Sequence, residues 1–269
     1  MTSKQSPWTG MVSFEDTALA TTDTGGTGRP VVYLNGSFAV QQNWRPVIDE
    51  LGPGYRHITF DERARGRSRR SKDYSFDSAV RDIGAVVSAR GVEHPILVGW
   101  SFGAAIAVHW ADRNPGLVGG VVSVDGAVPF GLTGEEGEEK IRRLFRRMAW
   151  MLPLVRPLGM AARMSAAEHA EQNIELNRMC AEMAPLLERL TCPVNYVLAT
   201  GGSLGGSHEL MEEMRASLNT VLARNPNLTV SAKVASNHQK ILKQDFRAVA
   251  QAVRALTETH TPGTAPSHP

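Results

Sequence analysis

Short apolar segments alternate along this chain with segments in which hydrophobic residues recur every three or four positions. Continuous apolar runs of about four to eight residues are typical of strands buried in a parallel sheet, and the wider spacing is typical of amphipathic helices. The alternation predicts an α/β fold, a mostly parallel sheet with helices on both faces. The strands are expected within residues 30–36, 56–61, 94–100, 118–125, 192–200 and 228–235, and the helices within 75–91, 102–115, 208–225 and 245–256.

Two parts of the chain depart from this alternation. Residues 12–23 alternate polar and apolar side chains, which predicts one or two antiparallel strands ahead of the parallel ones. Between about Val128 and Leu190 only helices are expected, and such an insertion between two strands is typical of a cap over the strand ends. We therefore expect an α/β core of residues 1–127 and 191–257, a helical cap of residues 128–190, and a disordered tail of residues 258–269 rich in Pro, Thr and Ser.

The candidate chemistry begins at Gly99-Trp100-Ser101-Phe102-Gly103, a G-x-S-x-G sequence between a predicted strand and a predicted helix. A sharp strand-to-helix turn exposes a serine hydroxyl, and glycines two residues before and after it leave room for the turn. The N-terminus of the following helix favours developing negative charge. We therefore predict that Ser101 is a nucleophile rather than part of a Gly-Ser turn without chemistry.

Two segments around this motif resemble the α/β-hydrolase family. Residues 97–115 look like the nucleophile elbow and the small-residue helix that follows it. Residues 30–44 resemble the oxyanion loop of that family, with Asn35-Gly36 in place of the usual His-Gly. The resemblance implies an α/β-hydrolase fold with a helical cap, and a serine hydrolase of the esterase or lactonase kind.

A third segment, residues 59–71, resembles the Asp-x-Arg-Gly-x-Gly-x-Ser turn of the same family, with Arg67 close to where a second glycine is common. Asp61 and Arg65 in this turn are expected to fix loop geometry rather than to react. The resemblance covers about residues 30–125 and 190–256. It is weakest in the cap, where substrate choice is determined.

The resemblance also implies where an oxyanion hole lies. One donor is the backbone N–H of Phe102, and the second comes from the loop after the strand at residues 31–34, which Gly36 opens. By resemblance the second donor is Ser37, with Phe38 as the alternative. Asn35 in place of histidine leaves a backbone donor intact, because that role requires no side chain.

His238 is the candidate general base. It stands between the last predicted strand and the last predicted helix, which is where α/β-hydrolases place their catalytic histidine. An imidazole titrates near neutral pH, so it can accept the hydroxyl proton and return it to the leaving group. The alternative is a surface-loop histidine, whereas His109, inside the helix after the elbow, is expected to be packed there.

Two carboxylates are candidates for the third member of a triad. Many α/β-hydrolases carry it after the strand equivalent to residues 192–200, but this chain has no Asp there, and Glu209 is the nearest carboxylate. Asp125 ends the strand predicted beside the one that carries Ser101. Some members of the fold, including certain lipases and the zearalenone lactone hydrolases, use that position. We therefore favour Asp125, which could hold His238 in the required tautomer, over Glu209, which looks like a first-turn helix residue.

The composition narrows the partners and the cellular setting. A formal net charge of +2 gives no support for a nucleic-acid partner. The start of the chain lacks the apolar segment of a secretory signal, and no stretch of about eighteen apolar residues suggests a membrane span. A cytoplasmic protein is expected, with Cys180 and Cys192 as free thiols, although a bridge between them stays open. We see no cofactor motif and no metal-ligand spacing. The choice between monomer and homodimer stays open.

The function expected from these residues is hydrolysis of a carboxylic ester or lactone of a small, largely apolar molecule through an acyl-enzyme on Ser101. Thioester hydrolysis is a close variant, and a cofactor-free lyase, perhydrolase or cyclase, or a non-catalytic small-molecule binder, are alternatives. Ser rather than Asp at the nucleophile argues against haloalkane dehalogenase and epoxide hydrolase chemistry. Methionines of the insertion line an apolar pocket or pack the cap internally, and both remain open. They are Met148, Met151, Met160, Met164, Met179 and Met183.

Overall fold

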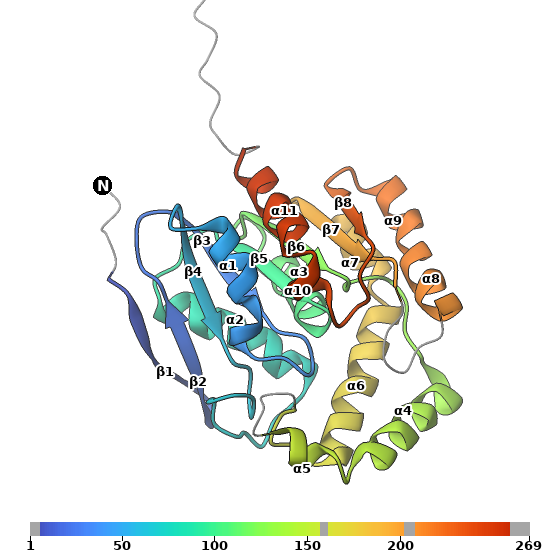
Figure 1. Cartoon of the computed structure of the whole chain (residues 1–269). Helices are drawn as coiled ribbons and strands as arrows, with labels where there is room; N and C mark the ends of the chain where they lie inside the picture. The colour runs from blue at the N-terminus through green and yellow to red at the C-terminus, as the bar shows by residue number, and fades with distance from the viewer. Residues whose placement is uncertain (1–5, 157–160, 202–207, 259–269) are drawn as a thin grey trace, which may run out of the picture.

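A computed structural model of the chain describes residues 6–156, 161–201 and 208–258. Within these residues the strands form one sheet in the order β1-β2-β4-β3-β5-β6-β7-β8 (Figure 1). The pairs β1–β2 and β2–β4 are antiparallel, and all the other pairs are parallel. The mostly parallel sheet with helices on both faces and an antiparallel start is therefore confirmed. The strands are β1 (Trp8–Phe14), β2 (Thr17–Asp23), β3 (Arg29–Leu34), β4 (Tyr55–Phe60), β5 (Ile96–Trp100), β6 (Gly120–Val124), β7 (Val194–Ala199) and β8 (Leu228–Val234).

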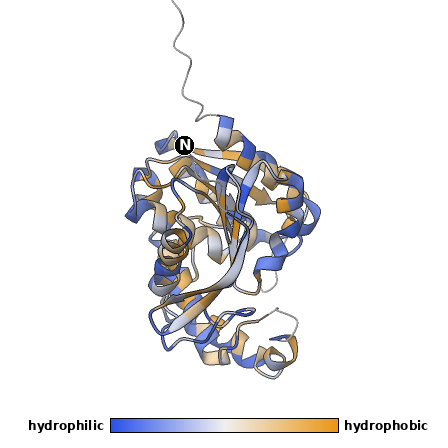
Figure 2. Cartoon of the chain, turned by 90° about the vertical axis from the view of Figure 1, so that its left-hand side faces the viewer, coloured by the Kyte–Doolittle hydropathy of each residue, from blue (hydrophilic) through white to orange (hydrophobic). Residues whose placement is uncertain are grey.

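Helices cover the sheet on both faces. Consecutive side chains of a strand point to opposite faces, so Val32 and Leu34 of β3 join one hydrophobic cluster and Val31 and Tyr33 join the other. Helices α2, α3, α7 and α9 pack in the first cluster, and α1, α10 and α11 in the second. Figure 2 shows the hydropathy of these elements from the side. The helices are α1 (Arg45–Leu51), α2 (Phe76–Ala89), α3 (Phe102–Arg113), α4 (Gly134–Met148), α5 (Leu152–Val155), α6 (Ala166–Ala181), α7 (Ala184–Arg189), α8 (His208–Ala216), α9 (Leu218–Arg224), α10 (Ile241–Gln244) and α11 (Phe246–Glu258), with a 3₁₀ helix η1 (Gln41–Trp44) before α1.

Two local features differ from the sequence pattern. The single helix expected at residues 208–225 is divided into α8 and α9 at Ser217, whose hydroxyl donates to the carbonyl oxygen of Met214 at 2.6 Å. Such a local side-chain bond competes with helical pairing. Helix α1 was not expected from the sequence. It carries Pro46 in its first turn, where proline is tolerated.

The insertion between β6 and β7 falls into two parts. Helices α4, α5 and α6, which we call the cap helices, lie at one end of the sheet (Figure 1). Helices α4 and α6 share a small hydrophobic cluster of their own, which includes Phe145 and Ile174. Helix α7 instead contributes Leu186 and Leu187 to the main core. No helix in the described ranges is long and apolar enough to span a membrane.

Candidate active site

Ser101 lies in a strained turn between β5 and α3. Its φ of 55° is in the left-handed region, which a residue with a side chain rarely adopts. The turn is held on both sides, because the Ser101 N–H donates to the Val124 carbonyl at 3.0 Å and the Ser101 carbonyl accepts from the Ala104 N–H at 3.0 Å. The strain is therefore imposed by the neighbouring strand and by the first turn of the helix, and it fixes the position of the serine side chain.

The glycines of the motif allow close backbone approaches. A Cβ atom at Gly99 would overlap the carbonyl oxygen of Gly103, and one at Gly103 would overlap the carbonyl oxygen of Leu34 at the end of β3. The first glycine lets the chain turn back on itself. The second lets α3 start directly against the strand that leads into the predicted oxyanion loop. The G-x-S-x-G spacing thus brings Ser101 and this loop together.

Asp125 lies directly after β6, beside the end of β5, with its side chain fully buried. Its Oδ2 accepts a hydrogen bond of 2.8 Å from Nδ1 of His238, and its Oδ1 accepts one of 3.1 Å from the N–H of Ala199. Arg215 of α8 donates to both oxygens, each at 3.1 Å. The contact that the sequence predicts between Asp125 and His238 is present in the structure.

The same donors control the charge of Asp125. Burial by itself would raise the pKa of this carboxyl, but the hydrogen bonds from His238 and Arg215 and their positive charges outweigh burial and hold the pKa below its ordinary value. Asp125 is therefore a carboxylate at neutral pH. A carboxylate on Nδ1 leaves Nε2 of His238 as the nitrogen that can take up a proton.

The loop after β8 places His238 close to the elbow. Its ring lies against that of Trp100, the residue before Ser101, with the ring centroids 5.6 Å apart. The loop itself is tied to the end of β7, because the N–H of Gly201 donates to the Ser236 carbonyl at 3.0 Å. Residues after β5, β6 and β8 thus meet at the carboxyl edge of the sheet, which is where open α/β sheets bind ligands.

Glu209, the alternative acid, lies in the first turn of α8 and is exposed. Asp125, and not Glu209, makes the contact with His238. The same helix contributes Arg215, which the sequence analysis did not single out. The sequence alone does not indicate a role for Arg215, because its partner Asp125 lies 90 positions away along the chain.

The predicted oxyanion loop follows β3, and Asn35 anchors its start. The N–H of Asn35 donates to Oε1 of Glu62 at 2.7 Å, and its side-chain oxygen accepts from Nε1 of Trp44 at 2.9 Å. The carbonyl of Gly36 accepts from Nη1 of Arg65 at 2.6 Å. Asn35 thus fixes the loop from within, and the two fully buried residues Glu62 and Arg65 hold it from behind.

The candidate oxyanion residues occupy different environments. Phe102 is buried at the start of α3, Gly36 is buried against the Trp100 ring, Ser37 is half-buried and Phe38 is 39% exposed. The guanidinium of Arg65 lies 5.3 Å from the centre of the Phe102 ring. Arg65 therefore contacts both segments from which the sequence predicts oxyanion donors. Its sequence context favoured a structural turn and left open that the turn borders the pocket.

The Asp61–Ser68 turn also buries the carboxyl groups of Asp61 and Glu62. Asp61 fixes η1, because its Oδ1 accepts from the Gln41 N–H at 2.9 Å, as expected of a structural residue. Burial raises the pKa of Glu62 to about 7, against the opposing effect of Arg65. Ala64 has a φ of 61° and stands where the family's turn has its first glycine. The departure from the pattern is thus at Ala64, while Arg67 is exposed.

The cap helices contact the predicted oxyanion loop through an aromatic cluster. The rings of Phe38, Phe145 of α4 and His169 of α6 lie with centroids 5.7 to 6.2 Å apart and nearly parallel. Burial lowers the pKa of His169 to about 4, so this histidine is neutral at pH 7. Of the methionines in the insertion, Met164 and Met183 are buried in hydrophobic clusters, and Met160 lies outside the described residues.

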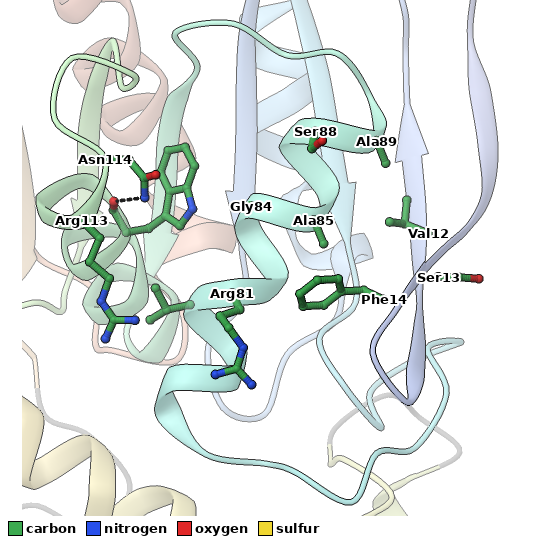
Figure 3. A pocket seen from close by; sticks show the side chains of 12 residues that line it. Val12, Ser13, Phe14, Arg81, Gly84, Ala85, Ser88, Ala89, Arg113 and Asn114 are labelled. Carbon is green, nitrogen blue, oxygen red and sulfur yellow. Dashed lines mark hydrogen bonds between the residues drawn. The ribbon is translucent and has the colours of Figure 1, made fainter.

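Other candidate features lie away from this edge. His109 is buried in α3 with its ring 4.9 Å from that of Phe76, as its sequence context predicts. A groove between β1, α2 and the C-terminal end of α3 is lined by Val12, Gly84 and Trp110 among others (Figure 3). That end of α3 is about 18 Å along the helix from Ser101. The groove is therefore separate from the candidate active site.

Residues 29–181 match the family model described as the alpha/beta hydrolase fold. This chain therefore belongs to the α/β-hydrolase fold family. It is 34% identical over 102 residues to a protein of Mycobacterium tuberculosis named as a non-heme bromoperoxidase, covering 37% of this chain and 39% of that protein. It is 35% identical over 124 residues to epoxide hydrolase B of the same organism, covering 45% of this chain and 34% of that protein. The matches span about a third to two fifths of these relatives.

Solved structures share the fold over nearly the whole chain. An esterase from Thermogutta terrifontis, solved with malate bound, has a TM-score of 0.70 and 20% identity, and covers 95% of this chain and 99% of that one. The haloalkane dehalogenase DatA from Agrobacterium tumefaciens also has a TM-score of 0.70, at 18% identity, and covers 94% of this chain and 97% of that one. These likenesses show the fold, whereas the reaction has to be argued from the site.

Proposed function

We propose that this protein hydrolyses carboxylic esters or lactones through an acyl-enzyme on Ser101. The observation that carries the proposal is the 2.8 Å contact between His238 and the buried carboxylate of Asp125, beside a strained serine at the same sheet edge. In this proposal Ser101 is the nucleophile, His238 the general base and Asp125 the group that orients His238. A carboxylate on Nδ1 of the histidine supports these roles, because it orients the ring and stabilises the imidazolium that forms.

The reaction has two stages that use the same residues. Nε2 of His238 takes the Ser101 proton as Oγ attacks the ester carbonyl, and the backbone N–H groups of Phe102 and of Ser37 or Phe38 bind the oxyanion. The intermediate collapses, the C–O bond to the alcohol breaks, and His238 returns the proton to the leaving alcohol. Water then attacks the acyl-enzyme with His238 as base, and the acid and free Ser101 are released.

The nucleophile separates this proposal from the chemistry of two of the matched proteins. Dehalogenation and epoxide opening transfer an alkyl group, and on a carboxylate nucleophile this gives an ester that water can cleave. On Ser101 the same alkyl transfer would give an ether, which the site has no means to hydrolyse. Acyl transfer gives an ester on Ser101, which can turn over. The serine therefore favours substrates with a carbonyl carbon.

Perhydrolysis is a second candidate, favoured by the match to the protein named as a bromoperoxidase. The first stage is the same, and hydrogen peroxide replaces water as the attacker of the acyl-enzyme. The products are a peracid and free Ser101, so no metal or redox cofactor takes part. Comparing acid and peracid yields from one ester in the presence of peroxide separates the two reactions.

We further propose that the cap helices determine the substrate. The support is that Phe145 and His169 of these helices stack with Phe38, which is itself a candidate oxyanion donor next to Ser37. All three rings are uncharged at pH 7, which suits an apolar acyl or alcohol group. A panel of p-nitrophenyl esters of increasing chain length, together with lactones of different ring size, would identify the preferred substrate.

The proposed function is tested with Ser101→Ala and a fluorophosphonate probe. We expect the wild type to be labelled at Ser101 and to hydrolyse at least one ester of the panel, and the alanine variant to do neither. Ser88→Ala is the matched control, because Ser88 is an exposed serine on α2. Substantial esterase activity in Ser101→Ala, equal to that of the control, would show that Ser101 is not the nucleophile.

A further inference from the structure

Arg215 makes a two-pronged contact with Asp125 that the proposed mechanism has not used. Its Nε lies 3.1 Å from Oδ1 and its Nη2 lies 3.1 Å from Oδ2. The Arg215 side chain is only 11% exposed, and that of Asp125 is fully buried. A planar guanidinium matches the two oxygens of a carboxylate in this geometry, which fixes the carboxylate plane as well as its charge.

Asp125 Oδ2 is shared by two donors. It accepts from Nη2 of Arg215 and from Nδ1 of His238, and Oδ1 accepts from Arg215 Nε and the Ala199 N–H. Within the described residues, the titratable or charged groups on this carboxylate are thus His238 from the loop after β8 and Arg215 from α8, while β7 supplies a backbone donor. Four donated hydrogen bonds leave the Asp125 carboxylate little freedom to rotate.

We propose that Arg215 is a positioning residue of the triad, which orients the Asp125 carboxylate toward His238. This inference rests on the proposed function, because it assigns Arg215 a role only if Asp125 and His238 act together. The segment after β7, where many members of the family carry the acid, here supplies a cation to an acid carried by β6. Arg215 acts through Asp125 and does not contact the reacting atoms.

Two effects of removing Arg215 follow. Loss of its positive charge raises the pKa of Asp125, so the carboxylate should become protonated at a higher pH than in the wild type, and the pH dependence of stability should report this. Loss of its hydrogen bonds frees the carboxylate plane, so His238 is oriented less well and kcat should fall. KM should stay the same, because Arg215 does not contact the substrate.

The experiment compares Arg215→Met and Arg215→Lys with the wild type, using the best ester of the panel across pH 4 to 9 (roughly the range over which carboxylate and imidazole groups titrate). We expect Arg215→Met to lower kcat about tenfold with KM unchanged. Arg215→Lys should recover only part of this kcat, since it keeps the charge but not the two-pronged geometry. Arg224→Met is the matched control, because Arg224 on neighbouring α9 pairs with the partly exposed Glu188.

A second measurement does not depend on turnover. Tm is compared between Ser101→Ala and Ser101→Ala/Arg215→Met from about pH 7 to about pH 3. The Tm difference should narrow as the pH falls below about 4, because protonation of Asp125 removes the ion pair. If Ser101→Ala keeps full esterase activity, the proposed function fails, whereas a Tm difference that does not depend on pH rejects the Arg215 proposal. A lower Tm with an unchanged kcat would also overturn it, and would leave Arg215 as an anchor for α8.

Discussion

Asp125→Asn tests the site most directly, because the substitution keeps the shape of the side chain and removes its charge. Among the described residues, the four hydrogen bonds that Asp125 accepts come from N–H donors on Ala199, Arg215 and His238. The side-chain oxygen of an asparagine can accept the hydrogen bonds that one of the two Asp125 oxygens accepts. Its NH₂ group then faces the N–H donors of the other oxygen and cannot accept from them. If the NH₂ faces His238, the imidazole tautomer reverses and Nε2 carries a proton that blocks its action as a base.

The magnitude separates a loss of chemistry from a loss of folding. Removing one partner of a buried ion pair lowers the free energy of unfolding by about 3–5 kcal/mol. Because Arg215 is slightly exposed, we expect a loss of about 3 kcal/mol here. A domain of ordinary stability, about 5–15 kcal/mol, stays folded after that loss. The rate should fall by about 10⁴-fold, as when the tautomer of a triad histidine is disturbed. Unfolding therefore cannot account for the expected loss of activity.

The assay pairs kcat/KM on an activated ester with urea unfolding of the same variant, and Glu209→Gln serves as the control. Because the folded-state pKa of Asp125 is lowered, its stabilising effect is complete above the ordinary carboxyl pKa of about 4 and is lost as the pH falls below it. The stability difference between wild type and Asp125→Asn should therefore shrink in acid. A folded Asp125→Asn variant that keeps more than about a tenth of wild-type activity would refute this reasoning, because a reversed His238 tautomer should leave much less activity than that.

Three further outcomes are expected. His238→Ala should lower kcat/KM about as far as Ser101→Ala, and the double variant should add little, because residues that act as one unit are not additive; additive losses would identify another base. Gly103→Ala should destabilise the fold by about 1–3 kcal/mol in urea unfolding and abolish labelling by the phosphonate probe, because its Cβ would overlap the Leu34 carbonyl; wild-type values for both would contradict the account of the elbow. Phe145→Ala should change the ranking of esters by chain length more than the rate with p-nitrophenyl acetate, and an unchanged ranking would reject the role proposed for the cap helices.

Local patterns predicted most of the sheet and the contact at its edge. The apolar runs located the parallel strands because buried strands need continuous hydrophobic sequence. Asp125 and His238 could be paired because Asp125 directly follows β6 and the family resemblance implies a catalytic histidine in the loop after β8. The carboxyl ends of parallel strands meet at one edge of the sheet. Their catalytic roles stay predictions until the variants are measured.

What the sequence did not reveal depends on contacts between distant segments. Arg215 and Glu62 look like ordinary charged residues in sequence, and their burial follows from the packing of α8 and of the Asp61–Ser68 turn. Neither periodicity nor spacing encodes such a partner. The division between α8 and α9 was missed for a different reason, because the hydrogen bond from the Ser217 hydroxyl to the Met214 carbonyl at this point is local.

The hydrogen bonds that join α6 and the residues just before it to the Asp61–Ser68 turn have a consequence for exchanging the cap helices. Arg163, just before α6, donates through its N–H to the Ala64 carbonyl at 2.8 Å and through Nη1 to the Gly66 carbonyl at 2.5 Å. Gln172 of α6 accepts from Nη2 of Arg65 at 3.2 Å, and Arg65 in turn holds the Gly36 carbonyl. A chimera that imports another cap between β6 and β7 would lose these contacts and loosen the loop beneath it. Such a chimera should therefore keep residues 163–172 of this protein, so that the hydrogen bonds to the Asp61–Ser68 turn are preserved under the imported cap.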